Sequence, residues 1–242
     1  MAEQQQQQRR ADIIDNLKNV RTAMENAGTS QKTRLVAVSK YKPAQDLLYA
    51  YEDGQRHFGE NYVQELVEKS AELPKDIQWH FIGHLQSNKA KAVIGIPNLY
   101  VVETVDSIKK ANTINKACDG LRSDPLRVYV QVNTSNEEVK SGVAPADVVN
   151  VCKHIIESCP RLNLSGLMTI GMFGRDPNEE NPDFKCLAAC KKQVEEALPG
   201  REELELSMGM SEDYVNAMRA GSTNVRVGRT IFGERPKKPT KD

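Results

Sequence analysis

One lysine stands at the end of a strongly apolar run near the start of the chain. In the stretch TRLVAVSKYKPAQ, residues 35–38 are apolar without a break, and Lys40 follows directly after Ser39. An apolar run of this length predicts a buried strand, and Pro43 stands where a helix can start. Because burial among cationic groups lowers the pKa of a lysine, a strand-end lysine is suited to form a Schiff base with an aldehyde.

The carboxyl ends of most of the other apolar runs also carry candidate site residues, and most of these are polar. They are Glu60 and Asn61, His84, Gln86 and Asn88, Asn133 and Lys140, Met168 and Thr169, Ser207 and Ser211, and Arg226, Gly228 and Arg229. Together with Lys40, the set holds four cationic side chains and many hydrogen-bond donors. In barrels of alternating strands and helices, the chemistry lies at the carboxyl ends of the strands. We therefore expect an anionic small molecule there.

The last two apolar runs are followed by residues typical of a phosphate site. Ser207 lies in LSMGMS, and Gly228 lies in RVGRTIFGE, where a short helix is predicted to start at Thr230. Serine, glycine and backbone N–H groups at these positions form the usual phosphate site of a barrel, and glycine lets the backbone approach a ligand closely. A closed barrel places its last strand beside its first. A phosphorylated aldehyde therefore fits between these residues and Lys40.

The alternation of apolar runs with helical patterns predicts the fold. The expected strands are 34–39, 56–59, 77–82, 100–103, 127–132, 162–168, 204–208 and 224–227. The expected helices are a lead-in helix over 10–26 and segments near 43–53, 61–71, 87–93, 107–121, 145–157, 183–197 and 212–220. Strands that are apolar on both faces, each followed by a helix, indicate a parallel sheet covered by helices. Eight such units in about 250 residues indicate a closed (β/α)8 TIM barrel, with an open doubly wound sheet as the alternative.

The chain shows no linker rich in proline and glycine, so we expect a single barrel domain over residues 10–235. Residues 1–9, which are rich in glutamine, are expected to form a disordered polar tail, and residues 236–242 a basic tail. The loop GMFGRDPNEENPDF follows the sixth strand and is long enough to form a flap at the barrel mouth.

Composition excludes several classes of protein. The 242 residues include 33 Lys and Arg and 33 Asp and Glu, so the net charge of zero speaks against nucleic-acid binding. The chain lacks an apolar stretch of the roughly 18 residues that a membrane span needs, and its N-terminus lacks the apolar segment of a signal peptide. We expect a cytoplasmic protein without membrane contact, and leave an organellar location open. The five cysteines indicate reduced thiols. We expect no metal site, because His80 and His84 lack neighbouring Cys or acidic ligands.

Six segments of the chain resemble the pyridoxal-phosphate homeostasis protein family, which is related to the barrel domain of alanine racemase and belongs to fold type III. The matching segments are spread from Arg34 to Arg235 and read VAVSKYKP, HFGENYVQE, WHFIGHLQSNK, GLMTIG, LSMGMS and GSTNVRVGRTIFGER. Together they are highly specific, whereas any one of them alone is weak.

The resemblance implies a cofactor, pyridoxal 5′-phosphate (PLP), and a role for each candidate residue. Lys40 would carry PLP as an internal aldimine, and Arg226 would face the pyridine nitrogen. The remaining contacts would come from Ser207 and the backbone of Gly228 and Arg229 at the phosphate, Asn61 at the ring, and Lys140 at the ring hydroxyl.

The resemblance also implies a role in vitamin B6 and amino-acid homeostasis without an established catalytic reaction. An arginine at the pyridine nitrogen leaves that nitrogen neutral, so the ring stabilises a carbanion poorly. We expect no counterpart of the β-rich second domain that supplies a base in racemases, and Ala44 stands where those enzymes carry a tyrosine. We expect a monomeric, non-catalytic PLP carrier that supplies PLP-dependent apoenzymes. A PLP enzyme acting on amino acids, such as a weak racemase, is the alternative.

Overall fold

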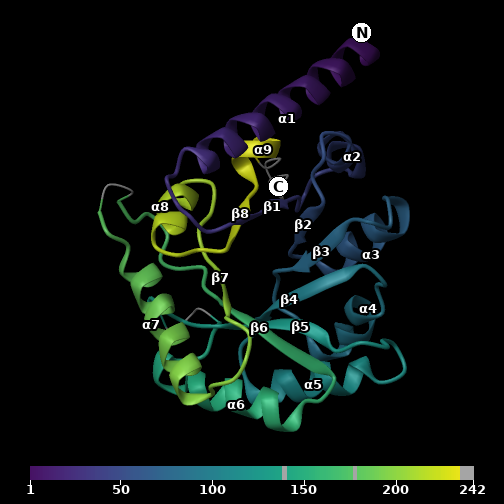
Figure 1. The fold of residues 1–242 in the computed structure, drawn as a ribbon. Helices are drawn as coiled ribbons and strands as arrows, with labels where there is room; N and C mark the ends of the chain where they lie inside the picture. Colours follow the sequence, from purple (N-terminus) through teal and green to yellow (C-terminus); the bar gives the residue numbers. More distant parts are fainter. Residues whose placement is uncertain (138–140, 177–178, 235–242) are drawn as a thin grey trace, which may run out of the picture.

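Eight parallel strands close into a barrel in the computed structural model, which describes residues 1–137, 141–176 and 179–234 (Figure 1). The strands are β1 (Arg34–Val38), β2 (His57–Glu60), β3 (Gln78–Phe81), β4 (Leu99–Val105), β5 (Leu126–Gln131), β6 (Leu162–Met168), β7 (Glu205–Ser207) and β8 (Asn224–Val227). Each strand pairs with the next, and β8 pairs in parallel with β1 from Arg34↔Asn224 to Ala37↔Val227. This closure confirms the single-domain barrel and excludes the open sheet.

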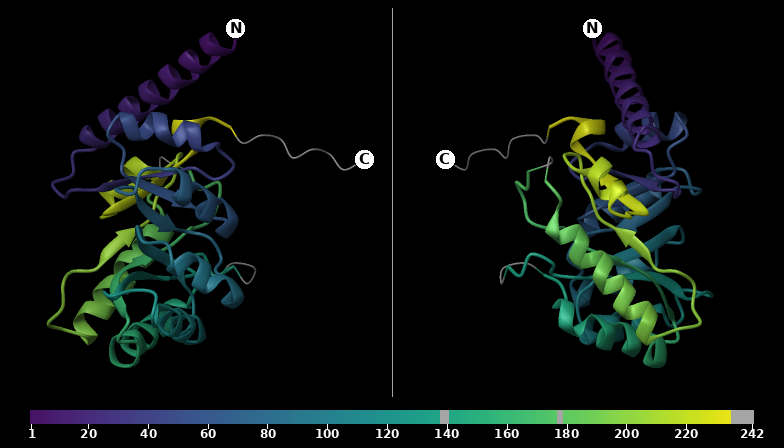
Figure 2. Two further views of the ribbon diagram at one scale, coloured as in Figure 1. Left: turned by 90° about the vertical axis from the view of Figure 1, so that its right-hand side faces the viewer. Right: turned by 60° about the vertical axis from the view of Figure 1, so that its left-hand side comes forward.

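Helices surround the barrel and follow the predicted order (Figures 1 and 2). They are α1 (Ala2–Glu25), α2 (Ala44–Glu52), α3 (Val63–Glu72), η1 (Ser87–Lys89), α4 (Ala90–Ile94), α5 (Ile108–Cys118), η2 (Pro145–Asp147), α6 (Val148–Ser158), α7 (Pro182–Ala197), α8 (Tyr214–Arg219) and α9 (Arg229–Phe232). The short helix expected from Thr230 is α9. Within the described part of the chain, the helices lack a segment long and apolar enough to cross a membrane.

The strands carry apolar side chains on both faces because each face meets a packed layer. In β5, Val128 and Val130 belong to the large buried cluster between the strands and the helices. Tyr129, between them in sequence, instead packs with Val101 and Met168 in a separate small cluster. Alternate residues of a strand point to opposite faces, so the second cluster lies inside the barrel.

Helix α1 corrects the expectation of a disordered tail over residues 1–9. The helix begins at Ala2, and its first turns extend away from the barrel (Figure 2). Gln, Glu, Ala and Arg all have high helix propensity, so a glutamine-rich segment continues a helix that packing has already started. That packing is supplied by Ile13, Leu17 and Val20, which are at most 1% exposed and lie on one helix face. The predicted basic tail at 236–242 lies outside the described residues.

Helix α1 also fixes the segment that follows β8. The Arg9 side chain donates to the Asp46 carboxylate of α2 at 2.5 Å and to the carbonyl of Phe232 at 2.8 Å. The Asn16 amide donates to the carbonyl of Ile231 at 3.1 Å. The lead-in helix therefore holds α9 and α2, which begin at the carboxyl ends of the paired strands β8 and β1.

Candidate functional site

A cavity of about 470 Å³ opens where the predicted site residues meet at the carboxyl ends of the strands. Of the six predicted site residues that the structure describes, five line it, which are Lys40, Asn61, Arg226, Gly228 and Arg229. Lys40 follows β1, Asn61 follows β2, and the other three belong to β8 and the start of α9. The β8–β1 pairing brings the two ends of the sequence together here. Lys140 lies outside the described residues.

Ser207 is the exception, because its side chain does not line the cavity. The residue is fully buried, and its hydroxyl donates to the Glu103 carboxylate at 2.5 Å. The same oxygen accepts hydrogen bonds from Asn224 at 3.0 Å and from Arg226 at 2.6 Å. A hydroxyl with these three partners has no further capacity for a phosphate oxygen. The predicted phosphate contact of Ser207 is therefore replaced by a contact within the barrel interior.

Ser211, the other serine that follows the seventh strand, is the one that reaches the cavity. It lines the cavity, and its hydroxyl accepts hydrogen bonds from the backbone N–H of Gly228 at 3.3 Å and of Thr230 at 3.4 Å. Both contacts are longer than an ordinary N–H···O hydrogen bond, and a charged phosphate oxygen is a stronger acceptor for such donors. A Cβ at position 228 would lie 2.9 Å from the carbonyl oxygen of Val38. Only glycine fits this close approach of the backbone after β8 to β1.

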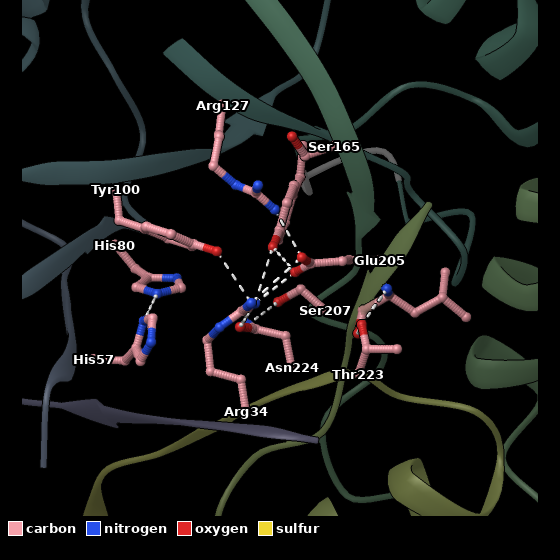
Figure 3. A network of polar contacts seen from close by, with 12 residues as sticks. Arg34, His57, His80, Tyr100, Arg127, Ser165, Glu205, Ser207, Thr223 and Asn224 are labelled. Atoms are coloured by element: carbon pink, nitrogen blue, oxygen red, sulfur yellow. Dashed lines mark hydrogen bonds and ion pairs between the residues drawn. The ribbon is translucent and has the colours of Figure 1, made fainter. Parts of the chain in front are cut away.

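Arg226 starts a chain of hydrogen bonds that crosses the barrel interior. Its guanidinium donates to Ser207 and, at 2.8 Å, to the carbonyl of Thr169. Ser207 donates to Glu103, whose other carboxylate oxygen contacts Nδ1 of His80 at 2.6 Å. Nε2 of His80 in turn contacts Nδ1 of His57 at 2.9 Å (Figure 3). Strands β8, β7, β4, β3 and β2 thus contribute one residue each.

The charges along this chain follow from burial and from the partners. Burial lowers the pKa of His80 and lowers that of His57 to about 3, so both rings are neutral at pH 7. Burial alone would raise the pKa of Glu103, but His80, Arg226 and Ser207 together hold it below its ordinary value. An ionised carboxylate only accepts hydrogen bonds, so His80 donates through Nδ1 and His57 donates to His80. Glu103 is therefore the buried counter-charge of Arg226.

The opposite end of the barrel is closed by an ion-pair network, which Asn224 connects to the chain of hydrogen bonds that starts at Arg226. Glu205 accepts from Arg34 at 2.5 Å and from Arg127 at 2.7 Å, and the Tyr129 hydroxyl also donates to it (Figure 3). A cavity of about 760 Å³ lies beside this network, lined in part by Arg34 and Glu205. In this architecture the amino ends of the strands serve stability rather than chemistry. We therefore assign no ligand to this larger cavity.

Several residues of the site escaped the sequence analysis. Glu103 and His80 lie within apolar strands. Their place in the alternation of inward and outward residues along each strand was the signal that could have placed them in the barrel interior. Lys42 and Phe173 line the cavity from loops. The Lys42 ammonium donates to the carbonyl of Glu234 at 2.6 Å. Phe173 belongs to the loop after β6 that was predicted as a flap, and it is 79% exposed.

The comparison with known families matches nearly the whole barrel. Residues 10–236 match the model for the alanine racemase N-terminal domain. A pyridoxal phosphate homeostasis protein of Schizosaccharomyces pombe is 46% identical over 224 residues, which cover 92% of this chain and 93% of the relative. This chain belongs to the pyridoxal phosphate homeostasis protein family. The human member is 49% identical over 219 residues, covering 86% of this chain and 80% of that protein.

Two solved structures have the same barrel. PipY of Synechococcus elongatus, determined with PLP bound, superposes with a TM-score of 0.79 and is 32% identical, covering 91% of this chain and all of PipY. Alanine racemase from Corynebacterium glutamicum superposes with a TM-score of 0.70 at 16% identity, covering 95% of this chain and 65% of the racemase. At that identity, the racemase comparison supports the fold alone.

Proposed function

We propose that this chain binds PLP in the 470 Å³ cavity as a Schiff base on Lys40 and serves in PLP homeostasis without catalytic turnover. The observation that carries the proposal is the meeting of Lys40, Arg226 and Gly228 in one cavity. It is supported by the names of the family members and by the PLP bound to PipY. We further propose that the chain is a cytoplasmic monomer that passes PLP to apoenzymes.

The residues of the cavity fit each part of this cofactor. Ser211 and the backbone N–H groups of Gly228 and Thr230 suit the phosphate, because they already gather donors around one oxygen position. The Arg229 side chain pairs with Glu212 at the surface, so we assign the phosphate role at this position to the backbone N–H alone. Asn61 lines the cavity beside Lys40 and has a buried amide oxygen without a hydrogen-bond partner among the described residues. That oxygen is available to a bound ring.

Lys40 supplies the covalent bond of the proposed complex. Its neutral amine would form the bond to the aldehyde carbon, and the aldehyde oxygen would leave as water together with the two amine protons. Bound PLP supplies an electron-withdrawing ring, and Arg226 limits that property because a cationic donor leaves the pyridine nitrogen unprotonated. Glu103 keeps Arg226 charged and, through Ser207, fixed in place. The arrangement therefore favours holding PLP over activating an amino acid.

Two serines of the same segment offer a matched test of the phosphate site. Ser211→Ala should weaken PLP binding by about 10- to 100-fold, because one hydrogen bond to a charged group contributes about 1.5–3 kcal/mol. Ser207→Ala should instead lower the free energy of unfolding by about 1–3 kcal/mol, since it leaves buried donors of Asn224 and Arg226 unpaired. Its effect on affinity should be the smaller of the two. Titration with PLP and denaturant unfolding of both variants measure this, and a reversed order of the affinity losses would return the phosphate to Ser207.

The absence of turnover separates a carrier from an enzyme. Incubation with L- or D-alanine in deuterated water should give no exchange at the α-carbon above that of free PLP, since a placed base contributes about 10²–10⁴-fold to such a rate. Mixing the loaded protein with an apo-form of a PLP enzyme should restore that enzyme's activity. The racemase-like fold is also compatible with the alternative, a PLP enzyme that acts on amino acids. Rapid exchange that is lost in Lys40→Ala would establish an enzyme.

A further inference from the structure

A buried lysine contacts the backbone of the residue that precedes the candidate cofactor lysine. Lys69 of α3 is 7% exposed, although lysine is among the residues least often buried. Its ammonium donates to the carboxylates of Glu60 and Glu65, each at 2.7 Å, and to the carbonyl oxygen of Ser39 at 2.9 Å. An ammonium has three N–H donors, and these three contacts use all of them.

This cluster contacts the residues on both sides of Lys40. On the amino side, the Ser39 hydroxyl donates to Glu60 at 2.7 Å, and the Ser39 carbonyl accepts from Lys69. On the carboxyl side, the backbone N–H of Tyr41 donates to Glu65 at 2.8 Å. The residues that flank Lys40 are therefore held by one continuous set of charges.

The backbone beside Lys40 is in a conformation that needs such support. Tyr41 has φ of +64°, in the left-handed region that side chains other than glycine rarely adopt. A residue in this region costs about 1–3 kcal/mol and persists only where its surroundings determine it. The hydrogen bond from Tyr41 to Glu65 is one such determinant, and Glu65 is itself held by Lys69, four residues later on α3.

We propose that Lys69, with Glu60 and Glu65, is a positioning group that fixes the backbone around Lys40 and so presents its amine to the aldehyde of the cofactor. The inference rests on the proposed Schiff base at Lys40. A purely structural ion pair would connect α3 to β2, but it would not need hydrogen bonds to the residues before and after Lys40. The geometry also predicts that the cluster governs the covalent step rather than non-covalent binding of the phosphate.

The double variant Glu60→Gln/Lys69→Met tests this role, because it removes the buried Glu60–Lys69 pair with similar side-chain volumes and leaves only the charge of Glu65, whose side chain is 24% exposed. Replacing a buried ion pair by neutral groups of similar volume is often neutral for stability. After PLP is added to the apo-protein, the Schiff base should form at least about tenfold more slowly than in the wild type, since small misplacements of a reacting group have effects of this size. Pyridoxine 5′-phosphate, which has an alcohol in place of the aldehyde, should bind with wild-type affinity.

A matched pair on α3 supports the test. Glu65→Ala removes the contact to the Tyr41 N–H and should also slow Schiff-base formation. Glu68→Ala, whose exposed side chain contacts only Gln64 among the described residues, should leave the rate unchanged. If the double variant does not fold, as judged by thermal unfolding, Glu65→Ala against Glu68→Ala decides the question.

The outcomes separate the two proposals. Wild-type rates in both the double variant and Glu65→Ala would overturn the positioning role and leave the proposed function intact. A wild-type protein that binds pyridoxine 5′-phosphate but forms no Schiff base with PLP would overturn the proposed function, and the positioning role with it.

Discussion

Lys40→Ala is expected to abolish every PLP adduct that borohydride can fix, while the protein still binds PLP non-covalently. The covalent bond depends on the Lys40 amine, whereas the phosphate contacts come from Ser211 and the backbone near Gly228 at the start of α9. Because these anchors are separate, PLP affinity should fall, but affinity for pyridoxine 5′-phosphate should stay close to that of the wild type. Absorbance spectra before and after borohydride, together with titrations of both ligands, measure the two effects.

Lys40→Arg is the matched control, because it keeps a cation at the strand end and removes only the reactive amine. It should also lose the adduct. A fixed adduct in either variant would place the Schiff base on another lysine. Loss of pyridoxine 5′-phosphate binding in both variants would show that Lys40 is needed for non-covalent binding as well.

Glu103→Gln is expected to lower the free energy of unfolding by about 3–5 kcal/mol, the usual effect of breaking a buried charge pair from one side. Glu103 is fully buried and accepts from Ser207 and His80, while Arg226 is 4% exposed and depends on this charge for compensation. Denaturant unfolding measures the change.

Glu203→Gln serves as the comparison for that loss. Glu203 accepts a hydrogen bond from Lys191 at 2.5 Å, but its side chain is 81% exposed. Removing the charge of Glu203 should therefore leave the unfolding midpoint unchanged. Equal midpoints for Glu103→Gln and the wild type would refute the role of Glu103 as the counter-charge of Arg226.

The fold was predictable because the barrel places packed layers on both faces of each strand. This geometry produces the runs rich in apolar residues that located all eight strands, and for 224–227 and 162–168 the predicted bounds match the observed ones. It also places Lys40 and Arg226 at the same mouth of the barrel, because the carboxyl ends of all eight parallel strands lie at one end of a closed barrel. The rest of the site depended on local geometry that patterns do not encode.

Two differences between the predicted and the observed structure show where such patterns stop being informative. Ser207 and Ser211 lie four residues apart around a glycine with φ of +94°, and only the turn decides which hydroxyl reaches the cavity. Residues 1–9 lack an apolar face, so nothing in their own pattern predicts a helix. Their helical structure depends on the packing of Ile13 and Leu17, further along α1.

The buried cluster behind Lys40 is a third case. Glu60, Glu65 and Lys69 are charged residues on a strand end and a helix, where a solvated surface is the usual interpretation. Their burial arises because α3 packs over the end of β2, and this is a tertiary contact.

The most direct test of the proposed function is to load the wild-type protein with PLP, reduce it with borohydride and map the modified peptide by mass spectrometry. We expect one pyridoxyl group per chain, attached to Lys40 in the peptide that contains VAVSKYKP. A group attached to Lys42 or to any other lysine, or a protein that binds PLP without any reducible adduct, would contradict this expectation.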